Sequence, residues 1–426
     1  MSPAPGQGGR PHTAVVAAAL AVVTAHLVLS GLFYMEAGLT ERIAWAALAV
    51  ITLGALAYWY DELSRPWRGV LLVAVGLPTV LFGIGVHASH LVQAGWDTAD
   101  FTGIPMLAAG LALSLIGTVT LVRTVRVWWR RLFLIPFGAV FAFFVIFPAG
   151  MGVFAANVAR VPCCDVTPAD HGLAYEDVTF DTPAGVELSA WYIPTQNGAA
   201  VITVHGAGNN RATVMDKAVL LAKHGYGVLM VDLEGFGDSE GRGNAFGWVG
   251  ARDVHATVAY LMNRPGVDPE RIGGIGHSMG GEVLLQASGE SPHLKAIVAE
   301  GASGRTAADF AELDDGWFEA IVPFHVVIGT TMRLISGEDT PPPLKETVQK
   351  IGPRRVLLIA ASVTEETELG ALYLELGGPS FEMWTIPESR HVGAHDLHPQ
   401  EYEERVIAFF DGALLGKEAS AETTTP

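Results

Sequence analysis

The first third of the chain alternates long apolar stretches with short polar breaks. The apolar stretches run over about 13–33, 43–60, 69–92, 104–122 and 132–156. Each is close to the roughly 20 residues that a helix needs to cross the hydrocarbon core of a bilayer. A single cleaved signal peptide does not account for them, because apolar segments keep recurring after the first. The pattern therefore predicts an all-α bundle of about five transmembrane helices within residues 1–158, surrounded by membrane lipids.

Arginines in the polar breaks predict how this bundle is oriented, because positive residues in short loops favour the cytoplasmic side. With a cytoplasmic N-terminus, only Arg42 and Arg160 fall on the opposite side. The arginines on the cytoplasmic side are then Arg10, Arg65, Arg68, Arg123, Arg126, Arg130 and Arg131. Five crossings from this start leave everything after residue 160 outside the cytoplasm.

From about residue 173 the pattern changes to short strands that alternate with helices. Strands are predicted at 175–180, 186–193, 199–204, 227–231, 271–275, 295–299, 355–361 and 381–386. Helices are predicted at 211–224, 249–263, 279–288 and 399–414. This alternation is typical of an α/β fold with a doubly wound, mostly parallel sheet. We expect this domain over residues 159–416, followed by a small, polar and disordered tail at 417–426.

A long insertion separates the strands predicted at 295–299 and 355–361. In a doubly wound sheet such an insertion lies over the carboxyl ends of the strands, where ligands bind. Its aromatic side chains include Trp317, Phe318 and Phe324. We therefore expect residues 301–353 to form a cap.

Charge is distributed as unevenly as hydropathy. The chain has a net charge of −18, and residues 156–426 alone hold 38 acidic and 18 basic residues. This negative field repels nucleic acid and anionic lipid surfaces, so neither is an expected partner of the second domain. The two cysteines, Cys163 and Cys164, are adjacent and stand in no metal-ligand spacing. Neither a metal nor an organic cofactor is implied.

The sharpest chemical signal is the sequence Gly-His-Ser-Met-Gly-Gly at 276–281, between a predicted strand and a predicted helix. A serine on such a tight turn is strained and exposed, and the flanking glycines let neighbouring backbone approach closely. The helix N-terminus also presents unpaired N–H groups to a developing negative charge. Ser278 is therefore the predicted nucleophile, and the N–H of Met279 is a predicted oxyanion donor.

Two further features complete this constellation. The glycine-rich turn His-Gly-Ala-Gly at 205–208 follows a predicted strand, and it would aim the N–H of Ala207 at the same oxyanion. His391 is the predicted base, since it comes soonest after the last predicted strand. His395 and His398 are its nearby rivals.

These features together resemble the α/β-hydrolase superfamily over about residues 173–414. The segment 232–239, Asp-Leu-Glu-Gly-Phe-Gly-Asp-Ser, is similar to the family's loop after the fourth strand. The element order and the short cap resemble the dienelactone-hydrolase and serine-aminopeptidase-like branches. The resemblance implies a Ser–His–acid triad that acts through an acyl-enzyme. Serine rather than aspartate at position 278 argues against the epoxide-hydrolase and dehalogenase branches.

The acid of this triad departs from the family pattern. The family usually carries it in a G-x-x-D turn after the strand predicted at 355–361, and Thr364 stands at that position. Glu365 is the nearest carboxylate, and its extra methylene would compensate for the shift, so Glu365 is the preferred acid. Glu366 is a close second. Glu300, at the end of the preceding strand, is a third, because some relatives carry the acid there and an acid must reach the far ring nitrogen of the base.

The sequence thus predicts a membrane-anchored serine hydrolase that cleaves an ester, thioester or amide bond in a small molecule or a lipid. Two other functions use the same residues. An acyltransferase would pass the acyl group to an acceptor other than water. A catalytically inactive hydrolase-like domain would serve as a receptor or scaffold, because a fold alone does not guarantee activity.

Overall fold

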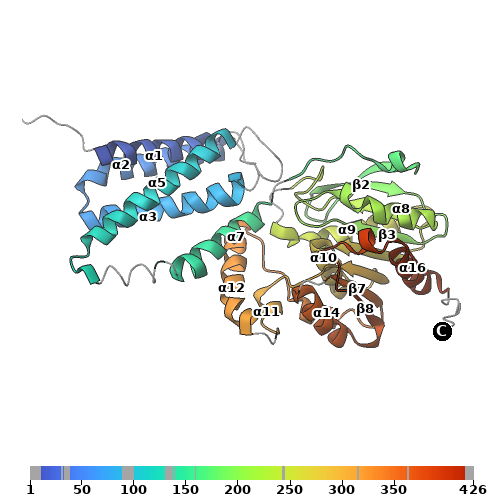
Figure 1. Ribbon diagram of the computed structural model, residues 1–426. Coiled ribbons are helices and arrows are strands. Elements are labelled where there is room, and N and C mark those ends of the chain that lie inside the picture. The colour runs from blue at the N-terminus through green and yellow to red at the C-terminus, as the bar shows by residue number, and fades with distance from the viewer. Residues whose placement is uncertain are drawn as a thin grey trace, which may run out of the picture. The chain divides into compact units, whose positions relative to one another are not determined.

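The computed structural model of the chain describes residues 11–29, 39–88, 100–129, 140–158, 160–241, 245–313, 316–361 and 364–417, together with positions 32 and 138. It divides into two compact units, Met1–Phe154 and Ala155–Pro426 (Figure 1). The first unit is helical, and the second holds the sheet. The predicted disordered tail lies, from residue 418 onward, outside the described residues.

Apolar helices make up the first unit. They are α1 (Pro11–Leu29), α2 (Leu39–Trp59), α3 (Arg65–Phe82), α5 (Asp100–Thr124) and most of α7 (Phe147–Ala156), with shorter helical turns at Tyr60–Glu62, Gly83–Ala88 and Ala142–Ile146. Glycines bring α3 and α5 together, as small residues commonly do between membrane helices. A Cβ added to Gly117 would lie 2.9 Å from the carbonyl oxygen of Gly69. A larger residue at position 117 would therefore push the two helices apart.

Three helices among the described residues are long and apolar enough to cross a membrane, namely Arg42–Glu62, Arg65–Phe82 and Phe101–Thr124. The prediction of five was therefore too high. The first and last predicted segments form shorter apolar helices within the described residues, Ala14–Leu29 and Phe143–Ala156.

The second unit is built on an eight-stranded mixed sheet in the order β1-β2-β4-β3-β5-β6-β7-β8. Strand β2 runs antiparallel to β1 and β4, and the remaining neighbours pair in parallel. The predicted α/β class and mostly parallel sheet are confirmed. The strands are β1 (Glu176–Asp181), β2 (Glu187–Ile193), β3 (Ala200–Val204), β4 (Gly227–Val231), β5 (Ile272–His277), β6 (Ala296–Glu300), β7 (Arg355–Ala361) and β8 (Phe381–Ile386).

Helices cover both faces of this sheet, so its central strands are buried on both sides. Successive residues of β4, Leu229 and Met230, belong to two different core clusters, as the alternation of side chains along a strand requires. One cluster includes side chains of α9 (Gly250–Met262), α10 (Met279–Glu290) and α14 (Thr364–Gly377), and the other includes side chains of α8 (Met215–Lys223) and α16 (Pro399–Phe410). Shorter turns lie at Pro168–His171, Arg211–Val214, Ala245–Gly247, Gly378–Ser380, Ala394–Leu397 and Asp411–Leu415.

Residues 301–353, between β6 and β7, hold three helices. They are α11 (Ala307–Phe310), α12 (Gly316–Ser336) and α13 (Leu344–Val348). α13 is part of the core, since its side chains Leu344 and Val348 are fully buried. α12 is longer and mostly apolar. The side chains of Trp317 and Phe318, named as cap aromatics, lie outside the described residues.

Candidate active site

Ser278 occupies a strained turn between β5 and α10. Its φ of 53° and ψ of −128° are unusual for a residue with a side chain. Glycines make the turn possible. A Cβ on Gly276 would meet the backbone of Gly280, and a Cβ on Gly280 would meet the carbonyl of Val204. The turn therefore holds the serine side chain out from the sheet, at the end of a strand where a substrate can approach.

Ser278 is hydrogen-bonded to His391, and His391 to Glu366. The Ser278 hydroxyl donates to Nε2 of His391 at 3.0 Å, and Nδ1 of His391 donates to Oε1 of Glu366 at 2.5 Å. The Glu366 side chain is 2% exposed and the His391 side chain 47% exposed. The hydrogen bond that His391 donates to Glu366 raises the pKa of His391 above its usual value. This chain has the geometry by which a base takes a proton from a serine and an acid orients that base.

Two backbone N–H groups lie beside this serine. A Cβ on Gly206 would lie 3.5 Å from Cβ of Ser278, so the turn at 205–208 borders the nucleophile. Met279 is the first residue of α10. Among the hydrogen bonds of the described residues, the N–H groups of Ala207 and Met279 have no acceptor. They have the placement that stabilises a negatively charged tetrahedral intermediate.

Comparison with known proteins supports the same interpretation. A family model described as X-Pro dipeptidyl-peptidase (S15 family) matches residues 176–335. The strand–turn–helix around Ser278 is the nucleophile turn of α/β-hydrolases. The chain is an α/β-hydrolase. Its matches relate it to esterases and peptidases.

Individual relatives cover parts of this hydrolase. YfhR of Salmonella typhi, an uncharacterized protein, is 34% identical over 129 residues, which are 29% of this chain and 42% of that protein. Polyketide transferase ATR5 of Stachybotrys chlorohalonatus is 32% identical over 128 residues, 29% of this chain and 43% of the relative. Esterase Pf2001 of Pyrococcus furiosus aligns with a TM-score of 0.48 and 26% identity, over 61% of this chain and 100% of the esterase. The hydrolase thus spans less than half the length of the first two relatives.

The preferred acid, Glu365, does not contact His391, and this expectation is corrected to Glu366. The cause is the helix α14, which begins at Thr364 and places both glutamates in its first turn. Adjacent helical residues point about 100° apart, so only one of the two can face His391. A threonine followed by two acidic residues is a signal for a helix start, and it would have indicated this geometry. The neighbouring Ser362 and Val363 lie outside the described residues.

Glu300, the third candidate acid, connects the nucleophile to the histidine loop. Its carbonyl oxygen accepts the N–H of Ser278 at 2.7 Å. Its side chain accepts the N–H of Ala394 at 3.3 Å and the hydroxyl of Tyr402 at 2.9 Å. The buried ammonium of Lys217 lies 3.7 Å away. Glu300 therefore holds the loop that carries His391, and its carboxylate is engaged away from the histidine ring.

The rival histidines pair with other carboxylates. His395 Nδ1 lies 3.3 Å from Asp216, and His398 Nε2 lies 2.9 Å from Glu388. Each of these contacts directs the imidazole toward a carboxylate other than Glu366. Of the three histidines predicted as possible bases, His391 is the one that is hydrogen-bonded to Ser278.

One group of possible metal ligands occurs among the described residues of the hydrolase, Cys163 with Asp232 and Asp238. Both carboxylates already pair with Arg211, which is buried. A cation would have to compete with this guanidinium for the same oxygens. The group therefore acts as an ion-pair network that fixes the loop after β4.

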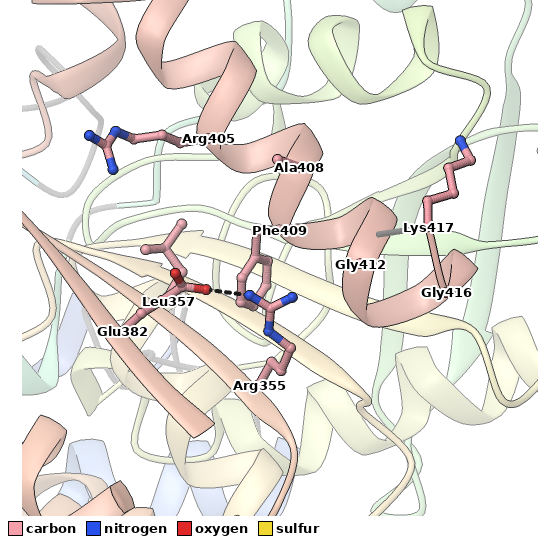
Figure 2. A pocket seen from close by; sticks show the side chains of 9 residues that line it. All are labelled: Arg355, Leu357, Glu382, Arg405, Ala408, Phe409, Gly412, Gly416 and Lys417. Carbon is pink, nitrogen blue, oxygen red and sulfur yellow. Dashed lines mark hydrogen bonds and ion pairs between the residues drawn. The ribbon is translucent and has the colours of Figure 1, made fainter. Parts of the chain in front are cut away.

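A cavity of about 470 Å³ lies at the start of β7, where Arg355 and Leu357 line it (Figure 2). Three cations line it, and each pairs with a carboxylate: Arg355 with Glu382, Arg405 with Glu401, and Lys417 with Asp411. Its other lining residues are Leu357, Ala408, Phe409, Gly412 and Gly416. Because its charges are compensated and it opens at the start of β7, this cavity is separate from the site at Ser278.

Proposed function

We propose that the chain is a membrane-anchored serine hydrolase that cleaves an ester, thioester or amide through an acyl-enzyme on Ser278. The observation that carries this proposal is the hydrogen-bonded series Ser278–His391–Glu366 beside two N–H groups without acceptors. Each member has a role in acyl transfer, and the three follow three different strands, β5, β7 and β8. The substrate is a small molecule or a lipid.

The reaction proceeds in two halves. His391 Nε2 takes the hydroxyl proton as Ser278 Oγ attacks the carbonyl carbon, and the N–H groups of Ala207 and Met279 hold the resulting oxyanion. His391 then gives the proton to the leaving group, which departs and leaves the acyl-enzyme. Water attacks this ester by the same route in the second half. Glu366 accepts the hydrogen bond of Nδ1 throughout, holds the imidazole in the required tautomer and stabilises its protonated form.

An acyltransferase is the second candidate, because one relative carries the name polyketide transferase. The two activities share the acyl-enzyme and differ only in the acceptor. Incubation with an acyl ester, with and without an added acceptor alcohol, separates them by product. A transferase yields the new ester in preference to the free acid.

The side of the membrane follows from the arginines after the last candidate span. The expected extracytoplasmic side depended on a crossing by 132–156, and that run holds no candidate span among the described residues. Arg123 and Arg126 lie at the end of α5 and just after it, and positive residues favour the cytoplasm. Without a further crossing, this proposal puts the catalytic unit on the cytoplasmic side with these arginines. Because the three candidate spans are an odd number, it also puts the N-terminus on the opposite side, contrary to the cytoplasmic N-terminus predicted from the sequence.

A fluorophosphonate probe tests the proposed nucleophile. The full-length protein in detergent should be labelled and should hydrolyse a short p-nitrophenyl ester, and Ser278→Ala should lose both. Undiminished labelling of Ser278→Ala would reject this nucleophile. A folded wild-type chain with neither labelling nor turnover would instead support the inactive receptor or scaffold.

A further inference from the structure

Helix α12 has two apolar faces, and one of them is packed. Ile328 and Met332 pack against Ala156, Ala245 and Trp248 in a small cluster. Ala156 is the last residue of α7, at the start of the second unit, where the chain passes from the membrane-anchoring unit into the hydrolase. The inner face of α12 therefore rests on the point at which the hydrolase is tethered.

The same cluster reaches the catalytic site. Its segment 245–248 includes Gly247, and a Cβ added there would lie 2.8 Å from Sδ of Met279. Met279 follows the nucleophile directly and supplies one of the proposed oxyanion donors. Only this short segment therefore separates α12 from the residue next to Ser278.

The outer face of α12 exposes apolar side chains to solvent. Val326 is 51% exposed and Leu334 is 78% exposed. The only formal charge between 322 and 336 is the exposed Arg333. Residues 156–426 hold 38 acidic side chains, and none of them falls in this stretch. The stretch 322–336 thus presents exposed apolar side chains on a domain that is otherwise strongly acidic, and its one cation, Arg333, pairs with Asp339 just beyond the helix.

We propose that the outer face of α12 binds the surface of the lipid bilayer in which the chain is anchored. The proposal rests on the membrane anchoring put forward above. It also says where the substrate of the Ser278 site comes from, namely an acyl ester held in the bilayer. The apolar stretch Val322–Ser336 is too short to cross a membrane. Exposed apolar side chains beside a cation suit a helix that lies in the interface. The chain joins this domain covalently to the proposed membrane anchor at Ala155.

Site-specific labelling of the full chain tests the docking. Leu334→Cys carries an environment-sensitive fluorophore in a Cys163→Ser, Cys164→Ser background, reconstituted in phosphatidylcholine vesicles that contain a doxyl-lipid quencher. The matched control is Glu404→Cys. This position is exposed on α16, which packs with α8 on one face of the sheet. The label at 334 should be quenched at least twofold more than the label at 404. Equal quenching at the two positions would overturn the proposal.

Measurements of turnover provide a second test, of whether the substrate is delivered from the bilayer. Val326→Glu with Leu334→Glu should lower turnover of a long-chain ester embedded in the vesicles by at least tenfold, and leave turnover of a soluble p-nitrophenyl ester within twofold. Equal loss on both substrates, or no loss on either, would overturn delivery from the bilayer. Absence of Ser278-dependent turnover of the soluble ester in the parent chain would instead refute the proposed hydrolase, whatever the label at 334 reports.

Discussion

The backbone N–H of Ser278 donates a 2.7 Å hydrogen bond to the carbonyl of Glu300, whose side chain also accepts the N–H of Ala394. One residue of β6 therefore fixes both the nucleophile turn and the loop that carries the base. The bond to Ser278 involves only the main chain, so any side chain at position 300 retains it. The bond to Ala394 depends on the carboxylate.

Glu300→Gln separates these two contributions. It should lower the free energy of unfolding by about 1–3 kcal/mol, because it leaves a buried polar partner without its acceptor. It should also lower the pKa of His391, since the charge of Glu300 raises it. Urea unfolding in detergent and the pH dependence of kcat/KM measure the two effects. A loss of activity as large as that of Glu366→Gln would make Glu300 the triad acid.

Glu365 and Glu366 are adjacent, so substituting each in turn tests which one is the acid of the triad. Glu366→Gln should reduce kcat/KM by about 10⁴-fold, because an amide no longer stabilises the protonated imidazole or its tautomer. Glu365→Gln should stay within about twofold, since the side chain does not contact His391. Steady-state kinetics on a p-nitrophenyl ester compares them, with fluorophosphonate labelling as a check on folding. The reverse ranking would restore Glu365 as the acid.

The pH dependence follows from the raised pKa of His391. The hydrogen bond that His391 donates to Glu366 stabilises the protonated ring. Its contribution to the stability of the fold is therefore complete below about pH 6.5, and it is lost as the pH rises through the pKa of His391 in the folded protein. Catalysis needs the neutral ring, so kcat/KM should rise with pH with a midpoint above about 6.5. Removal of the Glu366 charge should move that midpoint down in the residual activity. An unchanged midpoint would contradict the pairing.

The side of the membrane on which the catalytic unit lies can be tested directly. In intact cells, a single cysteine at Glu404 in the Cys163→Ser, Cys164→Ser background should react with a membrane-impermeant maleimide only after permeabilisation. This result is expected because the proposed topology puts the catalytic unit on the same side of the membrane as Arg123 and Arg126. Labelling of intact cells would place the unit outside and imply that 132–156 crosses the bilayer.

Local pattern was enough to predict the sheet. Runs such as 227–231 and 381–386 are apolar, short and bounded by turn residues, so their limits agree with β4 and β8. Ser278 was predicted because its chemistry is encoded in adjacent residues. Its geometric partner His391 was selected by its position after the last strand.

The remaining features depend on three-dimensional register. Glu300 lies beside the nucleophile because β5 and β6 pair with His277 opposite Glu300, and no local pattern specifies that pairing. Whether Glu365 or Glu366 faces His391 depends on the residue at which α14 begins, because successive side chains of a helix point about 100° apart.

The covalent tether at Ala155 changes what α12 needs in order to bind lipid. Docking of a tethered face is intramolecular, so its equilibrium is set by an effective concentration and not by the amount of enzyme. A few exposed side chains, such as Val326 and Leu334, then suffice where a free helix would dissociate. Weak contacts also release quickly, so the hydrolase would alternate between lipid-bound and free positions while it remains attached to the same membrane.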